Sequence, residues 1–211
     1  MKPPEKPVRF TTNSTNSTNP MNPTRSTPPR LAVVGSGGWG KNLVRVFCEL
    51  LGEEAVTVID PDSSRLAAMS ANHPGISTAE RPHWGQYDAA VIAAPAILHH
   101  DLAKQALESG AHVLVEKPIS LTSAHAAELI ALAQAQQRVL MVDHLLEYHP
   151  AVVRLKEMVR DGRLGRLLHL TSRRLNLGVI RTEENALWSL APHDISVILY
   201  FLDEEPLTVA A

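Results

Sequence analysis

The chain has 211 residues, of which 45% are hydrophobic, so it can form one folded domain and part of a second. A formal net charge of −2 gives no strong field for attracting nucleic acid or a membrane surface, so we expect neither partner and favour a small-molecule ligand. No apolar run approaches the roughly 18 residues of a membrane span, no secretory signal opens the sequence, and the single cysteine excludes an internal disulfide, which together predict a soluble cytoplasmic protein.

Residues 1–29 are rich in Thr, Asn, Ser and Pro and offer little to bury, which predicts a disordered tail. From Arg30 onward, short apolar runs rich in β-branched residues alternate with longer segments of helical periodicity. Strands are predicted over residues 30–36, 55–60, 76–78, 87–95, 111–116 and 138–142, and helices over 39–51, 63–71, 97–110 and 123–137.

In the first predicted helix, the apolar residues with helical spacing, which we expect to face the core, are Leu43, Val46, Phe47 and Leu50. The predicted strands are apolar throughout, which is typical of strands covered by helices on both faces. The alternation predicts an α/β fold, a Rossmann doubly wound parallel sheet over residues 30–147.

The pattern changes in the last part of the chain. A helix is predicted over 150–161, a strand over 166–175, a loop over 178–185, a helix over 185–202 and the beginning of a strand at 207–211. Residues 148–211 are therefore predicted to form an incomplete α+β second domain. A sheet made of one full strand and the beginning of another has an unprotected edge. We therefore expect either a partner that completes this sheet or a C-terminally truncated product. A complete second domain would allow a homo-oligomer.

A glycine-rich motif follows the first predicted strand and opens the first predicted helix. Gly35, Gly37 and Gly40 have the G-x-G-x-x-G spacing that lets backbone N–H groups approach a diphosphate without a Cβ in the way. The residues of this motif that we expect to bind the cofactor are Gly35, Ser36, Gly37, Gly38, Trp39 and Gly40.

The second predicted strand ends in Asp60, 25 residues after Gly35, close to the spacing at which an acid accepts the ribose hydroxyls of an adenine nucleotide. A carboxylate there would repel a 2′-phosphate, and Pro61 follows rather than an arginine. The sequence therefore predicts NAD as the cofactor in preference to NADP. The alternative is a glycine turn followed by a solvated aspartate.

The strand over 87–95 ends in Ala94 and Pro95 at the carboxyl edge, where open α/β sheets bind ligands, so both are predicted to contact the cofactor. His99 is predicted to border the nicotinamide, and the alternative is a surface residue at the start of a helix. His99 and His100 do not predict a metal site, because adjacent residues do not share a helix face and no cysteine or carboxylate lies at ligand spacing.

Glu116, Lys117 and Pro118 follow directly from the strand "HVLV". Strand ends in this fold project into the ligand crevice, so Glu116 and Lys117 are predicted to lie beside the nicotinamide, and the Lys117–Pro118 bond can be cis. A lysine there can hydrogen-bond an alcohol or carbonyl oxygen as hydride moves, and desolvation would lower its pKa and help it accept a proton. The alternative is a surface Glu and Lys ahead of a loop.

The glycine motif, the stretch "GAHVLVEKPIS" and a second α/β segment together resemble the Gfo/Idh/MocA family of glucose-fructose oxidoreductase, inositol 2-dehydrogenase and rhizopine catabolism proteins. The resemblance covers about residues 30–211, and it implies that residues 148–211 belong to a domain for substrate binding and oligomerisation. It implies that Lys117 contacts the reacting sugar hydroxyl and that His193, in "WSLAPHDIS", exchanges the proton. The same stretch is similar to the branch that acts on nucleotide-activated amino sugars, such as UDP-N-acetylglucosamine 3-dehydrogenases.

His193 also has a rationale of its own. Pro192 suits the first turn of a helix, so His193 is predicted to lie near a helix N-terminus, whose positive end disfavours imidazolium and leaves a neutral proton acceptor. Ser189 lies four residues earlier, where many proteins of the resembled family carry an aspartate that orients the ring. The alternative is a histidine that is hydrogen-bonded inside the second domain.

Arg173, Arg174 and Asn176 end the predicted strand of the second domain, and Arg181 follows in the loop. Arginines suit bidentate recognition of phosphate, which would fit the diphosphate of a nucleotide sugar. The alternative is the solvated face of a strand.

These features predict an NAD-dependent oxidoreductase that oxidises a hydroxyl of a sugar or nucleotide sugar by hydride transfer, with Lys117 and His193 handling the proton. The alternative is a non-catalytic dinucleotide-binding protein, either a truncated remnant or a regulator that senses its cofactor. Lys117 and His193 favour the enzyme, whereas the end of the chain at Ala211 favours lost activity.

Overall fold

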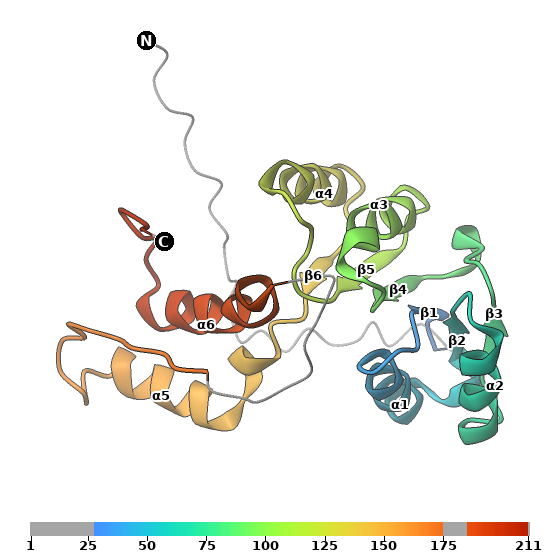
Figure 1. The fold of residues 1–211 in the computed structure, drawn as a ribbon, viewed down its shortest axis with the longest axis horizontal. Helices are drawn as coiled ribbons and strands as arrows, with labels where there is room; N and C mark the ends of the chain where they lie inside the picture. The colour runs from blue at the N-terminus through green and yellow to red at the C-terminus, as the bar shows by residue number, and fades with distance from the viewer. Residues whose placement is uncertain (1–27, 175–184, 211) are drawn as a thin grey trace, which may run out of the picture.

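The computed structural model describes residues 28–174 and 185–210, and a six-stranded parallel sheet forms its centre (Figure 1). The strands, in the spatial order β3-β2-β1-β4-β5-β6, are β1 Leu31–Val34, β2 Val56–Ile59, β3 Ser77–Ala79, β4 Ala89–Ile92, β5 His112–Val115 and β6 Leu140–Val142. Every neighbouring pair is parallel. The strand order reverses at β1 and β4, which is the switch point of a doubly wound sheet, so the predicted Rossmann fold is confirmed.

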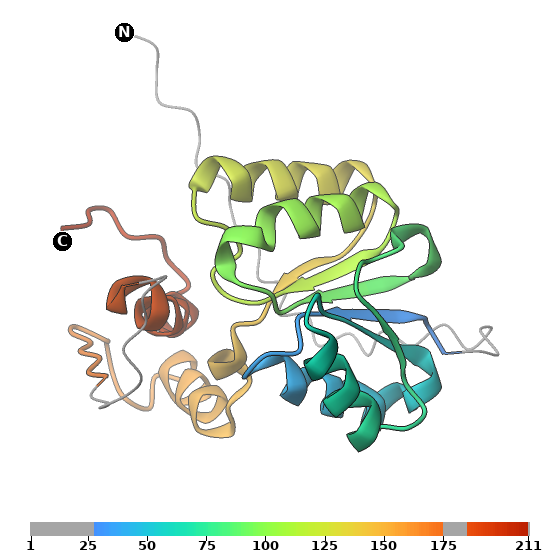
Figure 2. The ribbon, with the colours of Figure 1, turned by 45° about the vertical axis from the view of Figure 1, so that its right-hand side comes forward.

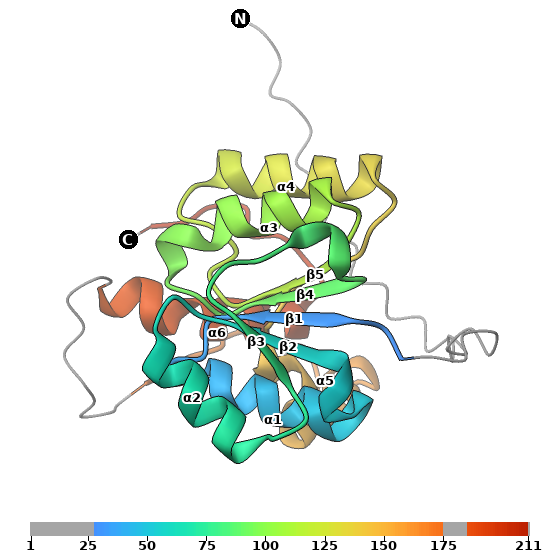
Figure 3. The same cartoon turned by 90° about the vertical axis from the view of Figure 1, so that its right-hand side faces the viewer.

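Helices cover both faces of this sheet (Figure 3). One face carries α1 (Gly40–Leu51) and α2 (Ser63–Asn72), and the other carries α3 (His99–Glu108) and α4 (Ser123–Ala135). Successive side chains of a strand point to opposite faces, so β1 contributes Leu31 and Val33 to the core under α1 and α2 and alternate residues to the core under α3 and α4. This two-sided burial explains why the strands are apolar throughout.

The predicted apolar face of α1 is partly wrong. Val44 is fully buried and Phe47 is partly buried in the core, whereas Leu50 is 70% exposed and Val46 is also exposed. The rotation of the helix follows from Gly40, because a Cβ there would lie 2.0 Å from the carbonyl oxygen of the first glycine of the loop. Residues i and i+4 share a helix face, so the close packing of Gly40 turns Val44 toward the sheet.

Beyond β6, the chain forms a short 3-10 helix, Leu145–Tyr148, and two longer helices, α5 (Pro150–Arg160) and α6 (Ala186–Leu202). These two helices lie side by side outside the two-faced sheet (Figure 2). Both had been predicted from the sequence to within one residue at each end. Among the described helices, none is both long and apolar enough to cross a membrane.

The two strands predicted for the last segment are wrong in their described parts. Residues 166–174 and 207–210 form no strand. A strand needs a neighbour for its N–H and C=O groups, and the six strands of the sheet do not extend to these residues. Several of their apolar side chains are correspondingly exposed, among them Leu168 (81%), Leu207 and Val209, whereas Leu167 and Leu170 are partly buried. The predicted tail up to residue 27, Asn176, and residues 178–184 of the predicted loop, with Arg181, lie outside the described residues.

Candidate functional site

The glycine loop connects β1 to α1 at the carboxyl edge of the sheet, and its glycines have different surroundings. Gly35 has a φ of +94°, and a Cβ there would lie 2.6 Å from the carbonyl oxygen of Ala93. Gly40 packs as closely against Gly35. A Cβ on Gly37 would meet nothing nearer than 4.0 Å, and one on Gly38 would meet nothing within 4 Å. The outer glycines therefore shape the loop, and the middle two leave its backbone open to a ligand.

The amino end of α1 is also open. No side chain caps this end, and its first turn contains no acidic residue. The half-exposed Trp39 stands immediately before the helix. Free N–H groups and the positive end of the helix dipole favour an anion here, so the loop and α1 fit the diphosphate of a dinucleotide.

Asp60, immediately after β2, is 2% exposed, so the alternative of a solvated aspartate is wrong. Its Oδ2 accepts hydrogen bonds from the backbone N–H and the hydroxyl of Ser36, at 2.8 and 2.9 Å, and its Oδ1 accepts one from the N–H of Asp62 at 3.0 Å. Burial raises the pKa of Asp60, but these bonds and the charge of Arg65 outweigh it and hold the pKa below its ordinary value. The carboxylate thus ties the glycine loop to the end of β2, and its contact with a ribose stays a prediction.

His99 is the first residue of α3 and is 2% exposed, so it is not a surface residue. Its Nδ1 lies 2.7 Å from the carbonyl oxygen of Pro118, and its Nε2 lies 2.7 Å from that of Ala94. The ring therefore joins the loop after β4, which includes the exposed Pro95, to the loop after β5. Since both nitrogens are engaged, contact with a nicotinamide would have to come from the ring carbons.

Lys117 follows β5, is half-buried, and precedes a cis bond to Pro118, as the sequence had allowed. Its Nζ donates a hydrogen bond of 2.9 Å to the carbonyl oxygen of Ser189, which lies in α6. An ammonium group has three N–H donors, so this bond leaves two for a ligand. Lys117 therefore links the end of β5 to the helix that carries His193.

Glu116 is half-buried beside Lys117, and its Oε2 accepts a weak hydrogen bond of 3.3 Å from the backbone N–H of Lys117. Burial, followed by the adjacent carboxyl group of Asp143, raises the pKa of Glu116 to about 8. Two carboxyl groups this close favour the retention of one proton between them at neutral pH. The site therefore holds a proton next to the lysine amine.

His193 does not lie at a helix N-terminus as predicted. Asn185 caps α6 by accepting from the N–H of Trp188 at 3.0 Å, so Pro192 and His193 lie in the interior of the helix. The pKa of His193 is nevertheless lowered, first by burial and then by the positive charges of its neighbours, which include Lys117. The neutral imidazole thus has another cause than the helix end.

The ring of His193 is not oriented through its Nδ1 by any described residue. His193 Nδ1 is buried without a hydrogen-bond partner among the described residues, so the hydroxyl of Ser189 does not fix the ring. Within the same part of the chain, His144 Nδ1 and Glu116 Oε1 are also buried and unpartnered. All three atoms belong to residues around Lys117, which makes this cluster the polar region of the structure with hydrogen-bonding capacity to spare.

Asp143 and His144 were missed by the reasoning from sequence. They follow β6 directly, just as Glu116 and Lys117 follow β5, and β5 and β6 are parallel neighbours. Burial lowers the pKa of His144, although the charge of Asp143 opposes this effect. A positive charge on His144 in turn lowers the pKa of His193. The rule that strand ends line the crevice could have identified both residues.

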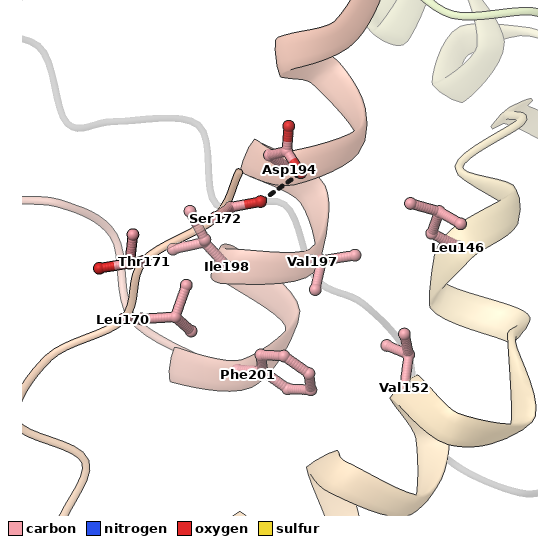
Figure 4. A pocket seen from close by; sticks show the side chains of 9 residues that line it. All are labelled: Leu146, Val152, Leu170, Thr171, Ser172, Asp194, Val197, Ile198 and Phe201. Atoms are coloured by element: carbon pink, nitrogen blue, oxygen red, sulfur yellow. Dashed lines mark hydrogen bonds between the residues drawn. The ribbon is translucent and has the colours of Figure 1, made fainter. Parts of the chain in front are cut away.

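Arg174 is engaged within the protein. Its Nε lies 3.0 and 2.9 Å from the two carboxylate oxygens of Asp194, which also accepts from the hydroxyl of Ser172 at 2.6 Å. Asp194 and Ser172 line a hollow of about 260 Å³ between α5, α6 and the irregular segment before residue 175 (Figure 4). The other residues that line it are Leu146, Val152, Leu170, Thr171, Val197, Ile198 and Phe201. The hollow is mainly apolar, and a phosphate contact of Arg174 stays a prediction.

In the described residues, no group of three or more His, Cys, Asp or Glu side chains is arranged to hold a metal ion. His100 instead lies 2.8 Å from Asp101 and 3.0 Å from Glu128, and its ring stacks on His125. These contacts join α3 to α4 on the outside of the sheet.

The chain is similar in sequence to a hydratase and to two dehydrogenases. The chain is 29% identical over 145 residues to a 2,7-anhydro-N-acetylneuraminate hydratase of Mediterraneibacter gnavus, covering 68% of this chain and 38% of the relative. It is 27% identical over 188 residues to an inositol 2-dehydrogenase of Corynebacterium glutamicum, covering 85% and 56%. A UDP-N-acetylglucosamine 3-dehydrogenase of Acidithiobacillus ferrooxidans is also 27% identical over 188 residues, covering 86% and 57%. The chain thus spans about two-fifths to three-fifths of these relatives.

A solved structure shares the fold of this chain, and a family model matches its sequence. The crystal structure of an NAD-binding protein from Listeria innocua matches with a TM-score of 0.72 at 24% identity, covering 84% of this chain and 56% of the other, and so shares the fold. The model of an oxidoreductase family with an NAD-binding Rossmann fold matches residues 29–144, more than half of the chain. The chain therefore belongs to the Gfo/Idh/MocA oxidoreductase family.

Proposed function

We propose that the protein is an NAD-dependent oxidoreductase that oxidises a hydroxyl group of a sugar or nucleotide sugar by hydride transfer. One observation carries this proposal. Lys117 Nζ donates a 2.9 Å hydrogen bond to the carbonyl oxygen of Ser189 in α6, and the same helix carries a neutral His193. These groups lie at the carboxyl edge of the same sheet that presents the open glycine loop. An amine, a neutral imidazole and a dinucleotide loop at one edge are the parts that alcohol oxidation requires.

When bound, NAD supplies the oxidised nicotinamide ring that takes the hydride. The free N–H donors of Lys117 would hold the substrate oxygen and stabilise its negative charge as the carbon–hydrogen bond weakens. A ring nitrogen of the neutral His193 would accept the hydroxyl proton. Burial of both residues strengthens these interactions, because the lower local dielectric increases electrostatic effects.

The substrate class is supported by the site and by the relatives. The unpartnered atoms of His144, His193 and Glu116 offer several hydrogen-bonding groups around Lys117, which suits a ring with many hydroxyl groups. Two of the relatives reported above are named as dehydrogenases of inositol and of a UDP-activated amino sugar. Both names describe polyhydroxylated rings, so we infer a substrate of that chemistry.

The test separates cofactor binding from chemistry. NAD binding is measured by calorimetry for the parent, for Lys117→Met and for the control Lys104→Met, whose lysine pairs with Glu128 on the outside of α3. Reduction of NAD is then followed with a panel of inositols, hexoses and UDP-sugars. We expect all three proteins to bind NAD alike, and Lys117→Met to lose about a hundredfold or more in rate.

Equal rates for Lys117→Met and the parent would remove Lys117 from the chemistry. Tight NAD binding by the parent without reduction by any member of the panel would instead favour a dinucleotide-binding protein without turnover. No NAD binding by the parent would contradict the proposal altogether.

A further inference from the structure

The positively charged side chain of Arg65 lies beside the glycine loop, and the reasoning from sequence did not consider this residue. Arg65 lies in the first turn of α2, and its Nη1 is 3.6 Å from Asp60 Oδ2 while its Nε is 3.4 Å from Asp62 Oδ2. The same Nη1 would lie 4.0 Å from a Cβ on Gly37. Its side chain is 54% exposed. The guanidinium therefore spans the space between the loop and the end of β2, within reach of solvent.

This space is where a Rossmann fold meets the adenosine end of a dinucleotide. The diphosphate lies on the glycine loop, and the ribose lies beside the end of the second strand, where an acid accepts the hydroxyls of NAD or an arginine accepts the 2′-phosphate of NADP. Here both kinds of group are present, and they are paired with each other. The preference between NAD and NADP therefore depends on whether a carboxylate or the guanidinium is free to contact the ribose.

The two carboxylates that neutralise Arg65 differ in how firmly they are held. Asp60 is buried, and both of its oxygens accept hydrogen bonds from Ser36 or from the N–H of Asp62. The side chain of Asp62 is 44% exposed and caps α2 through the N–H groups of Ser64 and Arg65. Asp60 is thus part of the loop, whereas Asp62 is an exposed charge next to the guanidinium.

We propose that Arg65 and Asp62 together set the preference for NAD over NADP, with Asp62 neutralising an arginine that would otherwise bind the 2′-phosphate. Asp62 repels that phosphate and occupies the donors of Arg65, while Asp60 stays committed to the loop. This assignment differs from the expectation that Asp60 itself discriminates between the cofactors. It rests on the proposed NAD-dependent function.

The decisive variant is Asp62→Ser, because serine caps a helix about as well as aspartate and removes only the charge. We measure the affinities of the full chain for NADH and NADPH by nicotinamide fluorescence. Those for 5′-AMP and 2′,5′-ADP, which probe the adenosine end alone, are measured by calorimetry. Asp62→Ser should tighten NADPH and 2′,5′-ADP by about tenfold, the value of one charge-assisted hydrogen bond, and leave NADH and 5′-AMP within about twofold. Asp62→Asn, which also caps well, serves if the serine variant folds poorly.

Two further substitutions test whether Arg65 causes the gain in affinity for NADPH and 2′,5′-ADP. Adding Arg65→Ala to Asp62→Ser should abolish it, whereas adding Arg81→Ala, an exposed arginine just after β3, should preserve it. An unchanged NADPH to NADH affinity ratio in Asp62→Ser, or a gain that survives Arg65→Ala, would overturn the proposal. If the parent binds neither NADH nor 5′-AMP, the proposed function fails first, and this inference fails with it.

Discussion

The sheet of residues 31–142 and the segment that contains α5 and α6 use similar apolar patterns with different results. In the centre of the sheet, β1 and β4 have a neighbouring strand on each side and helices on both faces, so residues such as Val33 and Ile92 are fully buried. In the α5–α6 segment, the apolar residues around Leu168 form no strand: Leu168 is exposed, and Leu167 and Leu170 are only partly buried. The difference teaches that an apolar pattern fixes which side chains can be buried, but a strand also needs a partner for its backbone.

The largest expected effect concerns the sheet region, where the backbone itself is closely packed. Gly35→Ala should destabilise the protein by about 4 kcal/mol, since the new Cβ would meet the carbonyl of Ala93 and alanine disfavours positive φ. Gly38→Ala is the matched control, because a Cβ there meets open space. Urea unfolding followed by circular dichroism measures both. Similar stabilities for the two variants would show that the loop does not hold its packed conformation.

A pair of leucine truncations compares the two regions directly. Leu129→Ala in α4 removes a fully buried side chain and should cost about 3 kcal/mol of unfolding free energy. Leu199→Ala in α6 removes a side chain that is 40% exposed and should cost less than about 1 kcal/mol. Denaturant midpoints at one pH measure the difference. Equal costs would mean that the outer face of α6 is covered in solution.

The smallest expected effect concerns Glu116, where the two regions meet. The folded protein keeps a proton on this group up to a pKa of about 8, whereas the unfolded chain loses it near 4.5. The folded state therefore binds more protons in this window, so the free energy of unfolding falls as the pH rises through it. Glu116→Gln should remove a decline on the order of 2 kcal/mol, after allowance for partial exposure.

The control for this prediction is Glu128→Gln. Hydrogen bonds from Lys104 and then His100 lower the pKa of Glu128, so its removal should not lessen the decline. Unfolding midpoints at several pH values between the two pKa values give the slope for each variant. A slope in Glu116→Gln that matches the parent would place the proton elsewhere.

Much of the sheet could be predicted from the sequence because local pattern and global fold agree there. The apolar strands, the glycine spacing and the aspartate at the end of β2 all refer to contacts within one supersecondary unit. Even the short β3, predicted over 76–78, forms within one residue of that range, at Ser77–Ala79. The rotation of α1 was missed because it depends on the contact of Gly40 with Gly35, which no helical periodicity reveals.

The candidate site was predicted less completely, because it combines residues from separate elements. Asp143 and His144 follow a strand that had been predicted, and the rule that strand ends line the crevice was applied to the residues after β5 but not to those after β6. The position of His193 inside α6 depends on where the helix begins, and Pro192 gave a misleading start signal. Arg65 was missed because its proximity to Gly37 arises only once α2 folds back beside the loop.

The ring of His99 has a consequence for how the crevice responds to its ligands. Its two nitrogens lie 2.7 Å from the backbone carbonyl oxygens of Ala94 and Pro118, so the link does not depend on the side chains at those positions. The loop after β4 and the loop between β5 and α4 are consequently held close to one another. We therefore expect a displacement on the dinucleotide side to move the residue next to Lys117 as well.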